Sequence, residues 1–327
     1  MVGIVKGTPP FFSQITIFRR SFKIKAPKTM KYAIRHLSFL GMLLLMILVS
    51  SCSRTEAPKV MARYVPERMD DFVFENDLTI GRIYGKALEK ETISPGIDIW
   101  VKMPGELVAD TLYKQDLEQG LSYHKFHGLG KDCYKVSRSL GAGASALLLE
   151  NRIQYPPTNY RSYELLEETD ERVTFVLHYP EWVVDEEHMA LDKKITIRSG
   201  SYFAKVEDTW TFSGPYGEKL HAAAGIFRHP SDNTIEKESL GKDTYAIWEH
   251  ASDTGAEPEE GMIGIAVYLP GADYTTLSHG DDHGLCVRDI TSGEPFVYYF
   301  GNCWSKAGVN SWEDWMGILE EFKKTAH

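Results

Sequence analysis

Short alternating strands separated by turn residues are the feature that most constrains how this chain folds. In KKITIRSGSYFAKVEDTWTF (193–212), Ile195 and Ile197 alternate with polar residues, and a Ser-Gly-Ser turn follows at 199–201. Such alternation is typical of a strand with one buried face, and glycine in a short connection is typical of a hairpin. The stretch therefore predicts an antiparallel hairpin.

The same pattern recurs from Asp70 to the end of the chain, without a low-complexity break or an internal repeat. In RVTFVLHYP (172–180), Val173, Phe175 and Leu177 fall on one face, and we expect them in the core. Further strands are predicted within 72–85, around an Asn-Asp turn, and at 245–249, 262–269 and 296–300. Many strands and few helices favour a mainly β fold, a large antiparallel β-sandwich, with an open barrel as the alternative.

One convincing helix closes the chain. Ser311, with Asp314 three residues later, forms a plausible capping box, although Glu or Gln is usual at the later position. The residues that follow at helical spacing are Trp312, Trp315, Met316, Leu319 and Phe322. We expect this stripe to face the core rather than a ligand, which adds a short C-terminal helix to the sandwich.

The beginning of the chain carries an export signal rather than a fold. Residues 31–52 read KYAIRHLSFLGMLLLMILVSSC, with basic residues first, then an apolar run, then small residues directly before Cys52. This ending resembles the lipobox of bacterial lipoproteins, in which the cysteine becomes the lipidated first residue. The apolar run is short for a bilayer span, so an uncleaved membrane helix is the less favoured alternative.

These features divide the chain into four parts. Residues 1–29 precede a natural start at Met30 and are interpreted as mistranslated upstream sequence. Residues 30–51 are then the signal peptide, 52–67 a polar tether and 68–327 a single β-rich domain. No aspartate and no acidic run follows Cys52 directly, so we expect an outer-membrane lipoprotein on the periplasmic side rather than on the cell surface.

Removal of the signal makes the exported part strongly acidic. The first 51 residues hold eight of the 36 Lys and Arg side chains and none of the 46 Asp and Glu, which leaves 28 basic against 46 acidic, a net charge of −18. Such a domain is a poor general binder of nucleic acid or of anionic membranes. We expect no nucleic-acid partner, membrane contact through the lipid anchor only, and an acidic ligand held by a few local cations.

Three cysteines remain after Cys52, namely Cys133, Cys286 and Cys303. They allow at most one disulfide and leave one thiol over. No CxxC pair exists, so neither a zinc ribbon nor a thioredoxin-like redox site is suggested.

Polar chemistry is concentrated in YHKFHGLGKDCYK (123–135). His124 and His127 are three residues apart, two glycines prevent regular structure, and Asp132 and Tyr134 follow at alternate positions. An imidazole oriented by a carboxylate is suited to acid–base catalysis. We expect His127, oriented by Asp132, in a cleft with His221 or Arg228; the alternative is a solvated polar loop.

A second polar stretch, SHGDDHGLCVRD (278–289), has mixed oxygen and imidazole ligands that suit a divalent cation. A solvated turn is the favoured interpretation, with a cation at His279, Asp281 and His283 as the alternative, and no cofactor is expected. The HEXXH, EF-hand and GxSxG motifs are absent from the sequence, which removes the usual support for zincin and α/β-hydrolase chemistry.

Further candidates are spread over later strands. His221 and Arg228 point to opposite faces if they share a strand, and Arg228 is the kind of side chain that clamps a carboxylate. Glu249 follows as a polar candidate, and Trp304 lies in an aromatic-rich region suited to a sugar face. Each of these residues, taken alone, is better explained by a structural role.

Several sequence blocks occur in a distinctive order: RYVPERMDDFVFEND, RIYG, GIDIWVK, YHKFHGLGKDCYKV with GAGASALL, LDKKITIRSGS and AAGIF. From about Arg63 to the C-terminus, this order resembles the family catalogued as domain of unknown function 4861. The resemblance implies an exported protein, often a lipoprotein, of polysaccharide-degrading bacteria, encoded beside genes for the breakdown of pectin and uronic acids. The strand pattern is also similar to the supersandwiches of galactose mutarotases and some polysaccharide lyases, a likeness of architecture only.

The resemblance leads us to expect an enzyme, a lyase or a hydrolase, acting on uronic-acid-containing oligosaccharides. In the lyase version, Arg228 binds the uronate carboxylate and His127 or Tyr134 removes the α proton. His124, Asp132 and His221 are the other expected catalytic residues, with Glu249 and Trp304 binding substrate. The alternatives are a non-catalytic glycan-binding lipoprotein and a mutarotase-like sugar epimerase.

Overall fold

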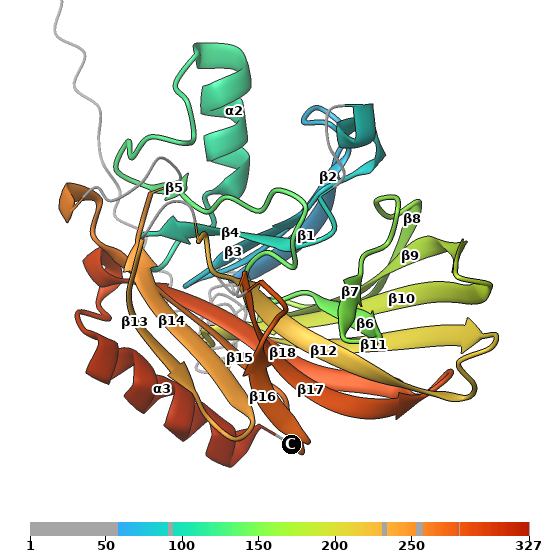
Figure 1. Cartoon of the computed structure of the whole chain (residues 1–327). Helices are drawn as coiled ribbons and strands as arrows, with labels where there is room; N and C mark the ends of the chain where they lie inside the picture. The colour runs from blue at the N-terminus through green and yellow to red at the C-terminus, as the bar shows by residue number, and fades with distance from the viewer. Residues whose placement is uncertain (1–57, 91–93, 231–233, 253–257, 281, 327) are drawn as a thin grey trace, which may run out of the picture. The chain divides into compact units, whose positions relative to one another are not determined.

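The computed structural model describes residues 58–90, 94–230, 234–252, 258–280 and 282–326, which belong to one compact unit, Glu56–His327. The expected start, signal peptide and lipidated Cys52 lie outside these residues. Within them, strands form three antiparallel sheets arranged as a sandwich rather than a barrel, so the expected β-sandwich is confirmed (Figure 1). No helix in this described part is both long enough and apolar enough to cross a membrane.

The first sheet is a meander of strands that are close in the sequence. Its strands pair in chain order and are β1 (Val60–Val65), β2 (Asp71–Asn76), β3 (Ile80–Ile83), β4 (Ile97–Lys102) and β5 (Gly130–Asp132). A short 3₁₀ helix, η1 (Lys86–Lys90), follows β3, and a longer helix, α2 (Ala109–Gln119), separates β4 from β5. The expected strands within 72–85 are β2 and β3. The expected boundary at 67 is wrong, because β1 lies within the expected polar tether, 52–67, and pairs with β2.

Helix α2 was not predicted, and its cap explains why. The preceding Val108 supplies no side-chain cap; instead the carboxylate of Glu75 accepts the N–H groups of Val108 and Ala109 at 2.7 and 2.8 Å. Glu75 is buried in β2 and also pairs with Lys102 at 2.7 Å. The helix N-terminus is therefore satisfied by a residue 33 positions away, which no local pattern reveals.

The eight-stranded sheet contains the predicted hairpin. Its order is β13-β14-β15-β18-β11-β10-β9-β8. Its strands are β8 (Ser162–Glu168), β9 (Arg172–Val184), β10 (Glu187–Arg198), β11 (Phe203–Ser213), β13 (Ile235–Leu240), β14 (Thr244–His250), β15 (Met262–Tyr268) and β18 (Pro295–Trp304). β10 alternates between buried and more exposed residues and pairs antiparallel with β11, which confirms the hairpin at 193–212. The helix η2 (Pro258–Glu260) precedes β15.

The third sheet has the order β16-β17-β12-β6-β7. Its strands are β6 (Ser145–Leu149), β7 (Arg152–Gln154), β12 (Lys219–Phe227), β16 (Tyr274–Leu277) and β17 (His283–Thr291). The middle of β12 consists of three consecutive alanines, Ala222, Ala223 and Ala224, which are buried on both faces of the strand. Small side chains let neighbouring strands and loops approach this sheet closely.

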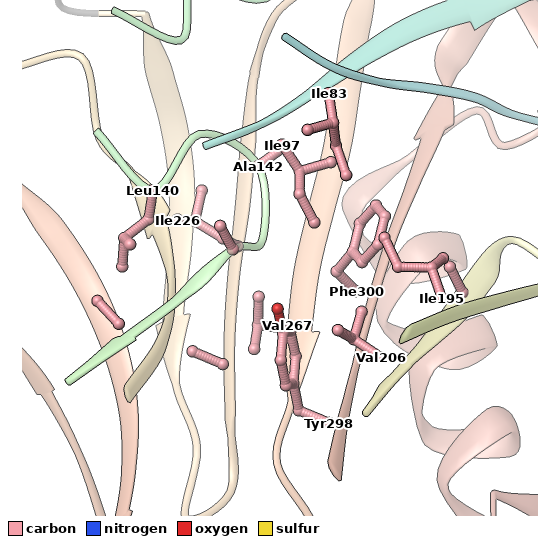
Figure 2. Close-up of a cluster of buried hydrophobic side chains, with 14 of the residues drawn as sticks. Ile83, Ile97, Leu140, Ala142, Ile195, Val206, Ile226, Val267, Tyr298 and Phe300 are labelled. Carbon is pink, nitrogen blue, oxygen red and sulfur yellow. The ribbon is translucent and has the colours of Figure 1, made fainter. Parts of the chain in front are cut away.

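Side chains from all three sheets meet in one hydrophobic core (Figure 2). Ile83 and Ile97 come from the first sheet, Val206 and Phe300 from the eight-stranded sheet, and Ile226 from the third. The predicted core residues Val173, Phe175 and Leu177 are also fully buried here. The core thus fixes the three sheets against one another by burial of apolar surface.

The C-terminal helix α3 (Trp312–Thr325) covers the outer face of the eight-stranded sheet, alongside β14 and β15 (Figure 1). Ser311 accepts the N–H of Asp314 at 3.1 Å, as the capping pattern predicts. Trp315 and Leu319 are buried, and the Trp315 ring stacks on Phe203 at 5.2 Å. The predicted helix and its core-facing stripe are confirmed; η3 (Ser305–Ala307) connects it to β18.

The three cysteines of the described chain, Cys133, Cys286 and Cys303, are free and buried. The sequence allowed one bridge at most, and the structure contains none among these three. Each thiol lies in a different part of the core and behaves as a small apolar side chain.

Candidate functional site

The segment from Gly130 to Gly141, here called the bridging segment, connects the first sheet to the strand ends of the other two. Its first part forms β5, which pairs with β4. Its later part reaches β12, where the carbonyl of Gly141 accepts the N–H of Phe227 at 2.8 Å, and β17, where the N–H of Leu140 donates to His283 at 3.2 Å. Two residues of the bridging segment contribute side chains, Asp132 and Tyr134, and two contribute backbone groups, Lys135 and Leu140.

Asp132, at the end of β5, binds a buried arginine rather than a histidine. Arg82 in β3 donates to Asp132 at 2.6 Å and to Asp98 at 2.7 Å, and Asp71 lies 3.7 Å from the same guanidinium. The rings of Tyr84 and Trp100 lie 4.8 and 4.9 Å from the guanidinium carbon, completing the arginine cluster of Arg82, Asp71, Asp98 and Asp132. The expected pairing of Asp132 with His127 is therefore replaced by an ion pair inside the first sheet.

The arginine cluster holds more carboxyl groups than its single cation can balance. Burial raises the pKa of Asp98 to about 7 and that of Asp71 to about 6, although Arg82 opposes both shifts. A carboxyl removed from water favours its neutral form unless enough cations surround it. Neither Arg82 nor Asp98 was singled out by the sequence, because their partners lie on different strands.

The two histidines of the 123–135 stretch remain at the surface. The ring of His124 lies 4.7 Å from that of Tyr123, tilted by 45°, and its Nδ1 atom lies 3.8 Å from the carboxylate of Asp132. His127 is exposed and has no side-chain hydrogen bond to any described residue. Of the two, only His124 is close to the arginine cluster.

A buried histidine–glutamate pair lies where β12 and β14 end. His229 follows β12, directly before Pro230, with a left-handed φ of 47°. Its Nδ1 atom lies 3.2 Å from Glu249, and its Nε2 atom lies 2.7 Å from the carbonyl of Lys135 in the bridging segment. Strained backbone at a non-glycine residue is common at functional sites.

The contacts of His229 define the roles of its two ring nitrogens. A carbonyl oxygen only accepts, so His229 donates from Nε2 to Lys135. Nδ1 then faces a carboxyl oxygen, Oε2, so the pair is either imidazolium with carboxylate or imidazole with carboxylic acid. Thr234 also donates to Oε2, at 3.0 Å, whereas Oε1 of Glu249 has no hydrogen-bond partner among the described residues.

Tyr134 supports His229 instead of offering a free hydroxyl. Its ring meets the imidazole edge-on at 4.7 Å, and its hydroxyl lies 3.0 Å from the backbone carbonyls of both Gly141 and Phe227. Burial raises the pKa of Tyr134 well above its ordinary value. The expected role of Tyr134 in removing a proton is therefore not supported by its geometry, and we regard it as a positioning residue.

Arg228 lies beside His229 but already binds a carboxylate. Its guanidinium donates to Glu238 at 3.0 Å and to the hydroxyl of Tyr245 at 3.1 Å, and 19% of the side chain is exposed. Tyr245 in turn donates to Glu238 at 2.9 Å. A ligand carboxylate would therefore share the guanidinium with Glu238 or displace it.

His283, at the start of β17, is held in one neutral tautomer. Its Nε2 accepts the N–H of Leu140 at 3.2 Å, so Nδ1 carries the hydrogen and donates to Asp282 at 2.8 Å. Burial lowers the pKa of His283, although Asp282 acts in the opposite direction. The Phe227 ring lies 5.3 Å from His283 and 4.8 Å from His229, so the two imidazoles flank it.

The cation considered at residues 279–283 receives no support from this geometry. His283 uses both ring nitrogens for the contacts above, and Asp281 lies outside the described residues. Where side chains are described, no group of three His, Cys, Asp or Glu residues is placed to hold a metal ion.

Trp304 is part of the core rather than an open stacking surface. It is 2% exposed, and its indole N–H donates to the carbonyl of Glu260 at 2.9 Å. Phe126, from the 123–135 stretch, covers it edge-on at 5.2 Å. Trp304 pairs across strands with Ile263, which pairs with Glu249, so the 123–135 stretch lies near the histidine–glutamate pair.

His221 lies at the opposite end of β12 from Arg228, so the two do not share a cleft. Its Nδ1 atom lies 2.5 Å from Asp289 on β17, at the rim of a 330 Å³ pocket that Tyr216 and Lys219 also line. A similar exposed cross-strand pair, His178 with Asp192 at 2.7 Å, occurs on another sheet. The His221 pair is therefore an ordinary cross-strand contact that happens to border a pocket.

The structure thus brings Tyr134, Arg228, Glu249 and His283 together with His229, and we call these five residues the strand-end cluster. His124 and Asp132 lie at the arginine cluster, while His221 is remote from both. In the sequence, His229 lies between a predicted strand and a proline. A structural turn has the same pattern, so this position alone did not identify His229 as a site residue.

Comparisons with known proteins agree with the blocks noted in the sequence. A model of the family described as Domain of unknown function (DUF4861) matches residues 48–327. A relative from Formosa agariphila, named "Uncharacterized protein P7", is 26% identical over 284 residues, which cover 80% of this chain and 67% of the relative. Neither description states a reaction or a ligand.

Proposed function

The chain belongs to the Domain of unknown function (DUF4861) family, and from this premise we propose that it is an enzyme acting on uronic-acid-containing oligosaccharides. The substrate class rests on the genomic setting that the family resemblance implies. The chemistry rests on the strand-end cluster. The single observation that carries it is the buried pair of His229 and Glu249, in which one carboxyl oxygen is held by His229 and Thr234 and no described residue hydrogen-bonds to the other.

A lyase reaction uses this pair directly. Glu249 accepts the α proton of the uronate at Oε1, while His229 stabilises the carboxylate through Oε2. Arg228 neutralises the substrate carboxylate, which lowers the barrier to removing that proton. The same pair returns a proton to the leaving oxygen, so the glycosidic C–O bond breaks as the double bond of the unsaturated product forms.

Two related reactions use the same residues differently. In a hydrolase, Glu249 would protonate the leaving oxygen and water would replace it. In a mutarotase-like epimerase, the pair would move a proton on the ring hydroxyl. The products distinguish the three: unsaturated uronates from a lyase, new saturated reducing ends from a hydrolase, and a changed anomeric ratio from an epimerase.

The decisive experiment incubates the mature domain with pectic oligosaccharides and follows all three products. Glu249→Gln keeps the size of the side chain and removes its basicity, so we expect turnover to fall by about 10²- to 10⁴-fold. Asp192→Asn, in the exposed pair with His178, is the matched control and should retain full turnover. An active Glu249→Gln enzyme would remove the basis of this proposal.

One observation favours a second function, glycan binding without catalysis. A pocket of 340 Å³ is lined by Tyr64, Tyr160 and Tyr163 together with Lys86 and Arg161. Tyr163 is 43% exposed and stacks over Tyr64 at 5.7 Å, as aromatic rings in sugar sites do. Two results together would show a binder. The native protein would bind pectic oligosaccharides without converting them, and Tyr163→Ala would abolish this binding.

We also propose that Cys52 anchors the domain to the outer membrane on the periplasmic side. The lipobox-like sequence before Cys52 is the supporting observation. Replacement of Cys52 by Ala should release a soluble domain on cell fractionation. Retention of the variant in the membrane fraction would show that something else holds it there.

A further inference from the structure

A cationic groove lies on the outer face of the eight-stranded sheet, beside the end of α3. Its volume is about 530 Å³. Four cations line it, Arg172, Lys194, Arg198 and Lys205, against two carboxylates, Glu167 and Glu207. This local excess of positive charge stands out in a domain whose exported part carries a net charge of −18.

The carboxylates of the groove do not neutralise its cations. Glu207 is shared between Lys194 at 2.9 Å and Lys205 at 3.3 Å, one contact to each of its oxygens. Burial alone would raise the pKa of Glu207, but the two lysines bring it below its ordinary value. Glu207 therefore stays ionised, and two ammonium groups still share its one negative charge.

Arg198 is the cation of the groove that is most available to a ligand, because its side chain is exposed. It lies directly across from Arg172 in the pairing of β10 with β9, and Arg172 is already in an ion pair with Glu167. Among the described residues, no side chain pairs with the guanidinium of Arg198. Like charges at directly opposed positions destabilise a sheet, and a bound anion would relieve this repulsion.

Hydroxyl groups form the floor between these cations. The Oγ1 atoms of Thr174 and Thr196 lie 3.0 Å apart, and the same cross-strand row continues through Lys205 to Tyr299. A row of hydroxyls flanked by cations offers hydrogen bonds to sugar hydroxyls and charge to sugar carboxylates. A ligand without hydroxyl groups would use the cations but not this row of hydroxyls, so the groove fits a sugar acid better than a simple anion.

We propose that this groove is a second binding site, one that holds a carboxylate-bearing sugar chain. Arg198 is its principal carboxylate ligand, Lys205 is the second, and the Thr174–Thr196 pair contacts the ring hydroxyls. The groove is separate from the strand-end cluster because Glu249 faces the core side of the same sheet, whereas neighbouring Trp248 faces α3 on the outer side. The site positions a long chain and takes no part in its cleavage.

The experiment measures binding by titration calorimetry in a Glu249→Gln background, so that the ligand is not consumed. The probes are an oligogalacturonate and a neutral malto-oligosaccharide of the same length. Arg198→Ala should weaken groove binding of the oligogalacturonate about tenfold or more, because a hydrogen bond to a charged group is lost. Arg152→Ala, a cation on β7 that is 60% exposed, is the matched control and should change nothing.

Stoichiometry separates this proposal from the proposed function. If the strand-end cluster also binds the ligand, Arg198→Ala reduces two sites to one; if it does not, one site becomes none. Unchanged binding in Arg198→Ala, or equal affinity for the neutral probe, would each overturn the groove proposal. Circular dichroism confirms that the variant is folded.

Discussion

At the scale of single residues, the molecule keeps its ionised groups in small, closely paired sets. Arg82 and Glu75 are both buried, and each contacts partners from other elements. Removal of one partner from such a set leaves an uncompensated charge and is strongly destabilising, even where the intact set adds little stability. These residues therefore specify how the strands of the first sheet pair more than how stable that sheet is.

Asp98 should make the stability of the protein depend on pH. Its pKa rises from an ordinary 3.8 to about 7 in the folded protein, so the folded state holds a proton that the unfolded chain releases within this window. The free energy of unfolding should therefore fall as the pH rises from 3.8 to about 7. Urea denaturation at several pH values measures this slope.

Asp98→Asn should flatten that slope, because asparagine resembles the protonated acid and can still accept from Arg82. Asp192→Asn, on an exposed carboxyl, should leave it as in the native protein. If the Asp98→Asn variant keeps the full slope, the proton is held by another group, with Asp71 the next to test.

At the scale of elements, tight turns reveal where the backbone is strained. Asp185 and Glu186 alone connect β9 to β10, and both have left-handed φ angles, 50° and 66°. This is the geometry of a two-residue hairpin turn that favours asparagine and glycine. The side chains of both residues are exposed, so their replacement disturbs no packing.

Glu186→Gly should stabilise the protein by about 0.5 to 1 kcal/mol, since relief of the left-handed strain exceeds the added entropy of the unfolded chain. Chemical denaturation of the native and variant proteins measures the difference. Glu164→Gly, in strand β8, should instead be destabilising, because glycine gains nothing where the backbone is extended. A Glu186→Gly variant less stable than the native protein would contradict this.

Elements defined by neighbouring residues could be predicted, and those defined by distant ones could not. The 193–212 hairpin and α3 carry their own alternation, turn and cap. Helix α2 depends on Glu75 for its cap and buries only Ala109, Leu112 and Tyr113. Because this apolar stripe is short and the cap comes from a distant strand, the local sequence does not indicate a helix.

The same limit applies to the candidate site. Residue types and glycine-rich loops pointed to Tyr134, Glu249 and Asp132, but partners could not be assigned. Asp132 is 50 residues from Arg82, and His229 is 94 residues from Lys135. Only the arrangement of the three sheets brings such residues within hydrogen-bond distance.

At the scale of the whole molecule, the three core thiols should report global unfolding. Cys133, Cys286 and Cys303 are at most 3% exposed, and burial raises the pKa of each thiol above its ordinary value. In a Cys52→Ala background, a thiol reagent should therefore react only when the domain unfolds. The labelling rate should follow the denaturant dependence of unfolding, and prompt labelling of the native protein would contradict this. A reductant should leave the melting temperature unchanged, and a lowered melting temperature would show that a disulfide forms.

The bridging segment makes the first sheet and the strand-end cluster parts of one cooperative unit. Asp132 is bound by Arg82, and three residues later the carbonyl of Lys135 is bound by His229. A ligand that stabilises the His229–Glu249 pair must then also disfavour opening of β3, β4 and β5, which the ligand never touches. Amide protons of these strands should exchange with deuterium more slowly when the cluster is occupied, a protection that gives a readout of ligand binding even where no product is formed.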